Sequence, residues 1–314
     1  MSRPASVQRR EALRILGWAA ASAWAPSAQA QEKPKKPDKS KRPKIEIPVD
    51  GPPENPLVPP DGAVPDLWFP VNEVVEYALR WSFIHVGASV VWSEWIREND
   101  RWLLAIRLRN RSNRALSKIY PVDDFIESVI DPATFLPLRF VKKMNEGHQR
   151  YDEITRFDHA KGVAVWESLR THKRNEFAIR ADTRDIPSLL WWLKKEAFEP
   201  GQPREFEVMA DEKIYRLVLR PEKWERIDVG RYRKIRCLKI EPKAEFGGVF
   251  VRAGRMWGWV SEDPRRIVPQ IVADIPIGSI SVLLERVSGP GDDFWVRGSR
   301  PSSRAPLSIQ ETSS

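Results

Sequence analysis

The densest group of acidic side chains lies in one short segment, where two carboxylates could serve as the acid and the base of a hydrolase. Its members are Asp123, Asp124, Glu127 and Asp131. Glycoside hydrolysis needs two carboxyl groups about 5 to 10 Å apart. In an extended strand Asp124 points away from the other three, which are spaced at roughly 13 Å along their shared side. This spacing favours a charged face, or ion pairs with Arg139 and Lys142, over catalysis.

Metal and nucleophile chemistry has no recognisable motif in the sequence. The four histidines are not spaced as metal ligands usually are; they are His85, His148, His159 and His172. There is no GxSxG elbow, no P-loop and no dinucleotide-binding glycine fingerprint. The single cysteine, Cys237, is interpreted as a small buried apolar residue. The sequence therefore predicts no catalytic residue, no metal site and no cofactor.

Tryptophan is unusually frequent, with 14 residues, most of them in strand-like runs. Indole combines a large apolar area with a polar tip, so it suits both a protein core and a ligand groove. One interpretation is a large core. The other is a groove for an acyl chain or a sugar, and its candidate ligand-binding residues are Trp81, Trp92, Trp95, Trp192, Trp257 and Trp259.

The stretch from Gly254 to Glu285 contains three strand-like runs, which would position two of these tryptophans. Residues alternate with a period of two through 256–261, 268–274 and 279–284. The sequence Asp263-Pro264-Arg265-Arg266 predicts the first turn, because proline presets a turn dihedral and aspartate bonds back to the backbone. A three-strand meander cannot bury its apolar side alone. It needs a second sheet, a helix or a ligand against that side.

Alternation predicts further strands on both sides of one helix. They are expected at Val75 to Phe83, Ala88 to Trp95, Trp102 to Arg109, Val122 to Ile130, Leu136 to Lys143, Arg150 to Phe157, Val163 to Leu169, Asn175 to Ile179, Arg204 to Met209, Lys213 to Arg220, Glu222 to Val229 and Arg233 to Glu241. Helical spacing of leucines predicts about three turns of helix over Asp185 to Phe198, capped by Asp185 or Thr183. The predicted fold is mainly β: one strongly curved antiparallel sheet or an open β-barrel, with one short helix capping it.

The two ends of the chain differ from its centre. Residues 1–30 resemble an export signal, with a basic start, a short apolar stretch and the small-residue site Ala28-Gln29-Ala30. Arg9 and Arg10 resemble a twin-arginine signal, with Sec export as the alternative. We interpret residues 31–66 as a disordered linker rich in proline and lysine, residues 67–288 as one β-rich domain and residues 289–314 as a disordered tail. The expected location is the periplasm, with no lipid anchor and no transmembrane helix in the mature chain.

The formal net charge of +9 bears on possible partners. Charges of both signs are interspersed, and no block of lysine and arginine lies on a predicted reading helix, so we expect no nucleic acid. An anionic membrane surface or peptidoglycan fits the basic balance better. The oligomeric state is left open.

Several runs, in their order and spacing, resemble the exported bacterial family known as DUF3108. They are 69–73, 77–81, 84–88, 124–128, 136–140 and 254–284. The resemblance covers about residues 68 to 287; Asn72 and His85 depart from the residues usual in the family. It implies a periplasmic β-rich fold similar to the open half-barrels of lipoprotein and lipid carriers. It implies no activity and no catalytic residues.

Three functions remain open at this point. The first is a non-catalytic envelope protein that holds a lipid, an acyl chain or another hydrophobic segment in a groove lined by tryptophan. The second is an envelope scaffold that binds peptidoglycan or another protein. The third is a glycan hydrolase that uses Asp124 or Glu127 with a carboxylate from another strand.

Overall fold

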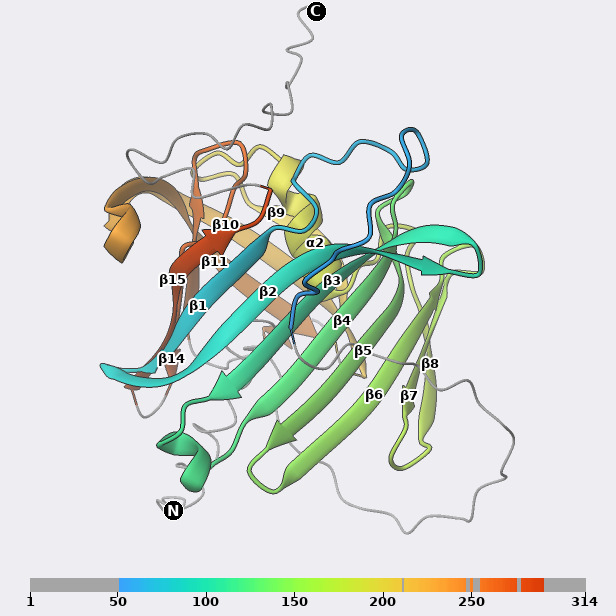
Figure 1. Ribbon diagram of the computed structural model, residues 1–314, viewed down its shortest axis with the longest axis horizontal. Coiled ribbons are helices and arrows are strands. Elements are labelled where there is room, and N and C mark those ends of the chain that lie inside the picture. Colours follow the sequence, from blue (N-terminus) through green and yellow to red (C-terminus); the bar gives the residue numbers. More distant parts are fainter. Residues whose placement is uncertain (1–50, 211, 247–248, 251–254, 276–277, 291–314) are drawn as a thin grey trace, which may run out of the picture.

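The protein is built around one antiparallel sheet, shown in Figure 1. The computed structural model describes residues 51–210, 212–246, 249–250, 255–275 and 278–290. The first eight strands are β1 (Val74–Trp81), β2 (Ile84–Glu98), β3 (Arg101–Ser112), β4 (Asp123–Asp131), β5 (Leu136–Glu146), β6 (Gln149–Asp158), β7 (Val163–Ser168) and β8 (Arg174–Ala178). The others are β9 (Arg204–Ala210), β10 (Lys213–Asp228), β11 (Lys234–Phe246), β12 (Val249–Phe250), β13 (Met256–Ser261), β14 (Gln270–Ile275) and β15 (Gly278–Ser288).

Four helical segments interrupt this series within the described residues. They are the α-helix α2 (Ile186–Trp192) and the 3-10 turns η1 (Leu116–Lys118), η2 (Leu193–Lys195) and η3 (Gly230–Tyr232). Helix α2 lies between the two arms of the sheet, behind β2 and β3 and in front of the strands at the back of Figure 1. The prediction of a mainly β fold with one short capping helix is confirmed.

The order of the strands is β8-β7-β6-β5-β4-β3-β2-β1-β15-β14-β13-β11-β10-β9, with β12 on β11. Most neighbours are consecutive in the chain, since short turns join antiparallel strands. The pairing of β1 with β15, which lies near the other end of the domain, is an exception. This pairing joins the two arms into one sheet. The sheet bends so strongly that β1 to β6 form a front layer and β10 and β11 form a back layer (Figure 1).

The two edge strands, β8 and β9, approach each other through side chains. Lys173 Nζ and Asn175 Nδ2 both donate to Glu212 Oε2, at 2.8 and 2.9 Å. An apolar cluster beside them contains residues from both arms, including Trp166 and Met209. A single bridge between Arg184 and Val208 continues the contact. We call this contact the seam; it closes the curved sheet by side-chain packing and not by a ladder of backbone hydrogen bonds.

The predicted turn after β13 is confirmed in its mechanism. Arg265 N donates to Asp263 Oδ1 at 3.1 Å, and Arg266 N donates to Asp263 O at 3.0 Å. Arg266 takes a left-handed φ of 46°, which is uncommon for a residue other than glycine. The turn therefore holds the backbone of Arg266 in a strained conformation.

Three local predictions differ from the structure. The break expected at Pro221 does not occur, because β10 runs through it with a bulge between Pro221 and Lys223, where proline's missing N–H is tolerated. Phe83, expected on the buried side of β1, is 86% exposed in the turn after that strand. The helix from Asp185 is shorter than predicted. The α-helix α2 has seven residues, and the chain then continues as the 3-10 turn η2.

Candidate functional site

A cavity of about 250 Å³ lies inside the curved sheet, beside α2. Its walls come from both arms of the sheet and from the helix. Lining residues include Val75 and Tyr77 from β1, Val91 from β2, Ile106 and Leu108 from β3, Leu189 and Trp191 from α2, Leu217 and Leu219 from β10, Ile240 from β11, Gly258 and Val260 from β13, Ile271 from β14 and Val282 from β15. Almost all of these side chains are apolar, so the cavity suits an apolar ligand.

The alternation of each strand sends these side chains to one common face. Val91 is paired with Leu108 and with Val75, and side chains opposite each other in an antiparallel pair share a face. On the other arm Ile271 is paired with both Val282 and Gly258. The concave face of the sheet is therefore a continuous apolar surface across strands that are distant in sequence.

Gly258 shapes one wall of the cavity. It lies inside β13, and a Cβ added to it would meet no atom within 4 Å. Glycine weakens a strand because it packs nothing and costs backbone entropy. Here the missing side chain leaves space on the cavity side of β13, which gives this glycine a physical role.

Helix α2 is fixed at the cavity by its capping residue. Asp185 Oδ1 accepts from Ser188 N at 2.8 Å, and Asp185 Oδ2 accepts from Ser128 Oγ of β4 at 2.6 Å. Burial raises the pKa of Asp185 to about 6, although these hydrogen bonds act in the opposite direction. The cap therefore joins the helix to the sheet as well as starting it.

Two charged side chains, Lys194 and Arg266, are among the described residues that line the cavity. Lys194 Nζ lies 3.7 Å from Glu73 Oε1, and the same carboxylate lies 3.3 Å from Arg265 Nη1. Lys194 Nζ also lies 4.9 Å from the centre of the Trp191 ring. Burial lowers the pKa of Lys194, and Glu73 opposes that effect. These groups form a cationic end on an otherwise apolar cavity.

A second polar group is buried on the concave face of β4. Asp124 is paired with Asn110, which is paired with Ser89, so the three side chains share that face. Asp124 Oδ1 accepts from Asn145 N at 2.9 Å, and its Oδ2 is buried without a hydrogen-bond partner among the described residues. Burial raises the pKa of Asp124 to about 7.

The acidic cluster is therefore split between the two faces of β4. Glu127 is paired with Arg107, and Arg107 Nε donates to Glu127 Oε2 at 2.8 Å. Arg139 Nη2 also donates to Glu127, at 3.3 Å, as the ion-pair interpretation expected. Lys142 pairs with Glu153 at 2.7 Å. Asp124 and Glu127 point in opposite directions, so these two carboxylates do not form an acid–base pair with each other.

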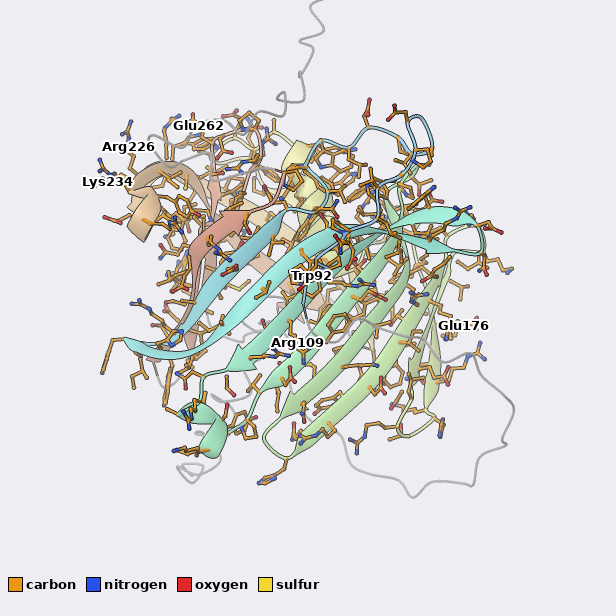
Figure 2. All side chains as sticks on the ribbon, viewed as in Figure 1. Trp92, Arg109, Glu176, Arg226, Lys234 and Glu262 are labelled. Atoms are coloured by element: carbon orange, nitrogen blue, oxygen red, sulfur yellow. The ribbon has the colours of Figure 1, made fainter. Side chains whose placement is uncertain are left out.

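None of the six candidate tryptophans is among the described residues that line the cavity. Trp92 lies on β2 (Figure 2), and its Nε1 donates to Glu94 Oε1 at 2.9 Å on the face opposite Val91. Trp95 is buried with Phe69 and Phe135, and Trp81 packs at the end of β1. The ligand-contact role of these tryptophans stays a prediction, and among the described residues that line the cavity the indole comes from Trp191, in a lining that is mostly aliphatic.

Two other candidates, Trp257 and Trp259, lie on the side of β13 opposite the cavity. Trp257 Nε1 donates to Glu222 at 3.1 Å, and Trp259 Nε1 donates to Glu225 at 2.7 Å. Lys239 Nζ lies 4.7 and 5.6 Å from their ring centres. Gly258 and Val260, which alternate with them, line the cavity. The two indole rings thus contact the charged groups of Glu222, Glu225 and Lys239 on the outer side of β13.

The last candidate, Trp192, turns away from the cavity that its neighbour Trp191 lines. The Trp192 ring lies 4.6 Å from Arg184 Cζ and packs edge-on against Phe206. Trp191 O accepts from Trp68 Nε1 at 2.9 Å, across 123 residues of sequence. Four lining residues were not among the candidates predicted from the sequence: Trp191, Gly258, Lys194 and Arg266. Only Gly258 left a signal, as a glycine inside a strand pattern.

Metal centres and membrane-spanning helices are two further features that the described residues do not contain. No group of three or more histidine, cysteine, aspartate or glutamate side chains is arranged to hold a metal ion. No helix in the same part of the chain has the length and hydropathy that a membrane span requires. Cys237 is fully buried, and burial raises the pKa of its thiol to about 12.

Comparison with known proteins gives a family. A family model described as "Protein of unknown function (DUF3108)" matches residues 76–285, in agreement with the resemblance found in the sequence. No curated protein matches the chain. The crystal structure of a beta-barrel-like protein of domain of unknown function DUF1849 from Brucella abortus is similar, with 13% identity and a TM-score of 0.48, over 70% of this chain and 98% of that one. Because the family model spans well over half of the 314 residues, this protein belongs to the DUF3108 family.

Proposed function

We propose that this protein is a non-catalytic binding protein of the bacterial envelope, and that it holds a hydrophobic chain in the cavity beside α2. The observation that carries the proposal is the cavity of about 250 Å³ with a mostly apolar lining. Natural protein interiors contain few voids larger than a water molecule, because unfilled space forfeits dispersion contacts. An apolar cavity of roughly 150 Å³ is enough to take up benzene, so this one has room for part of an acyl chain.

Two features support binding over simple packing. Leu190 lines the cavity and is 40% exposed, so apolar surface there is left uncovered by the protein's own side chains. Gly258 adds no side chain at a position where one would fit. A core selected only for stability would use such a position to fill the space. The export signal expected over residues 1–30, which lies outside the described residues, supports the envelope as the location.

The test places a larger side chain at Gly258, in the wall of the cavity that β13 forms. In Gly258→Leu the new side chain is expected to occupy part of the cavity, since a Cβ at this position meets no atom within 4 Å. We expect the purified wild-type chain to bind 1-decanol in isothermal titration calorimetry. We expect Gly258→Leu to bind it at least about tenfold more weakly, since several buried methylene contacts are lost. Thermal unfolding checks that the variant is folded.

The matched controls are Trp257→Phe and Trp259→Phe, on the opposite side of the same strand. We expect both to bind 1-decanol as the wild type does. Weakened binding in these controls with normal binding in Gly258→Leu would move the site to the tryptophan cluster. No binding of 1-decanol by the wild type, together with sedimentation of the protein on peptidoglycan sacculi, would replace the carrier role by the scaffold role.

A further inference from the structure

The cavity has a charged end that an apolar ligand alone does not explain. Of the two cations there, Lys194 already has a carboxylate, because Glu73 lies 3.7 Å away. Glu73 in turn is shared with Arg265 at 3.3 Å. Arg266 has no such partner among the described residues: its Nη1 is buried and makes no hydrogen bond.

Two buried arginines of this protein, Arg107 and Arg109, show how its carboxylates neutralise a guanidinium. Arg107 contacts both Glu94 and Glu127, and Arg109 makes a two-fold contact with Asp123 at 2.8 and 2.9 Å. A buried donor without an acceptor costs free energy, and more when it carries a charge. Arg266 therefore differs from these arginines in having, within the described structure, no carboxylate at ion-pair distance and a buried Nη1 without an acceptor.

The backbone holds this arginine in place. Arg266 lies at the end of the turn that Asp263 organises, with a φ of 46° that few residues other than glycine adopt. The next residue, Ile267, is buried and also lines the cavity. Strained backbone of this kind persists only where the surroundings enforce it, and it is common at binding sites. The turn thus fixes the backbone of Arg266 at the cavity, which its side chain lines.

Charges on the neighbouring segments leave an excess of positive charge at this end. Glu73 contacts both Lys194 and Arg265, and Asp263 lies 3.8 Å from Arg265, so these two carboxylates are shared by two cations and Arg266 adds a third positive charge. A further acid that acts on Arg266, Glu196, is hydrogen-bonded to Arg204 at 2.6 Å. Burial lowers the pKa of the Arg266 guanidinium, and Glu196 opposes this only from a distance.

We propose that the ligand is an amphipathic anion whose acyl chain occupies the cavity and whose carboxylate or phosphate accepts hydrogen bonds from Arg266. Lys194 supplies the second positive charge at the same end. The inference rests on the proposed function, because it adds a head group to the hydrophobic chain proposed there. Arginine suits this role, since its planar fork can donate two parallel hydrogen bonds to a carboxylate or a phosphate and it stays charged when buried.

The experiment compares three ligands with the same ten-carbon chain and different head groups. Decanoate, decyl phosphate and 1-decanol are titrated into the purified chain by isothermal titration calorimetry. We expect the wild type to bind at least one anion about tenfold or more tightly than the alcohol, as a charge-assisted hydrogen bond allows. A preference for decanoate points to a free fatty acid as the source, and a preference for decyl phosphate points to a phospholipid.

The variant Arg266→Gln removes the charge and keeps a polar side chain of similar reach. We expect it to lose about tenfold or more in affinity for the preferred anion and to bind 1-decanol within twofold of the wild type. Arg266→Lys, which keeps the charge without the planar fork, is expected to lose less, and it serves as the test if the glutamine variant does not fold. Arg101→Gln is the control, because this exposed arginine pairs with Asp131 on the turn side of β4.

Three results separate the possible failures. Equal affinity of the wild type for all three ligands, or an equal loss for all three in Arg266→Gln, would overturn the head-group proposal and leave the hydrophobic site intact. An equal loss of anion affinity in Arg101→Gln would overturn it too, because the attraction would then be the general positive charge of the chain. No binding of any of the three ligands would remove the proposed function itself.

Discussion

Buried charged side chains in this protein differ in how far their partners neutralise them. Arg107 of β3 sits between Glu94 of β2 and Glu127 of β4, and all three are buried on the face of the sheet that points away from the cavity. Asp124 on the cavity side of β4 has one backbone donor and a second oxygen without a partner among the described residues. Ionic groups on the outer face are thus paired within the protein, whereas Asp124 and Arg266, on the inner side, are incompletely paired.

The first prediction at the residue scale concerns Asp124. Its pKa in the folded protein is raised to about 7, above the value of about 3.9 for an unfolded chain. The folded state therefore holds this proton more tightly, and the carboxyl group lowers stability as pH rises from about 4 to about 7. We expect Asp124→Asn to remove a slope of up to about 1.4 kcal/mol per pH unit in that window. The variant should be more stable than the wild type at pH 8.

Urea unfolding of both proteins at pH 5, 6, 7 and 8 measures this difference. Asparagine keeps the oxygen that accepts from Asn145 N, so the hydrogen bond is retained. Asp100→Asn is the control, because this aspartate in the turn between β2 and β3 is almost fully exposed. A difference between wild type and Asp124→Asn that stays constant with pH would show that burial does not raise the pKa of Asp124.

At the scale of the element, α2 is too short to be stable alone, since isolated helices below about 12 residues are marginal in water. Its seven residues depend on Asp185, whose carboxylate binds both Ser188 N and Ser128 Oγ. Leu189 then packs against β9, β10 and β11. The helix is held by this cap and by one apolar face, and Leu189 of that face lines the cavity.

We expect Asp185→Ala to be less stable than Asp185→Asn by about 1–2 kcal/mol, the usual value of a helix cap. Comparison of the two variants isolates the cap, because both lack the carboxylate charge and only asparagine retains an oxygen acceptor. Chemical denaturation gives the free energies, and hydrogen exchange of Leu189 and Leu190 amides reports on the helix. Equal stability of the two variants would mean that packing alone positions α2.

At the scale of the whole molecule, the seam is the contact that holds the two edges of the curved sheet together. Met209 of β9 is buried in the apolar cluster that also contains Phe157 and Trp166 from β6 and β7. Only one isolated backbone bridge is seen there among the described residues, between Arg184 and Val208. The two arms of the sheet are therefore joined more weakly at the seam than anywhere along the ladders.

We expect Met209→Ala to cost about 2–4 kcal/mol, because it removes buried contacts that span the seam. Hydrogen exchange of the β8 and β9 amides should rise more than that of β2 and β3. Met209→Leu conserves the volume and is expected to cost less than about 1.5 kcal/mol. A uniform rise in exchange over all strands would show that the seam is not a separate, weaker unit.

Much of the secondary structure was predictable from local pattern. Alternation placed most strands, Asp263 and Pro264 marked the turn after β13, and Asp185 with Pro187 marked the start of α2. These signals are local, because a turn, a cap or a period of two depends on residues within a few positions of one another. The continuous strand through Pro221 was not predictable, since only its paired neighbour β11 supports the bulge.

Local pattern could not decide which side of each strand faces the cavity. On β13 both sides carry apolar residues, so Trp257 and Trp259 were plausible wall residues until Glu222 and Glu225 of β10 were seen to bind them from outside. The charged end of the cavity likewise depends on Glu73, which lies 192 residues from Arg265 in the chain. The sequence by itself determined the strands, the turns and the capping helix, because these follow from neighbouring residues. Only the tertiary structure decided the lining of the cavity and the position of Arg266, because these follow from the curvature of the sheet and the pairing of β1 with β15.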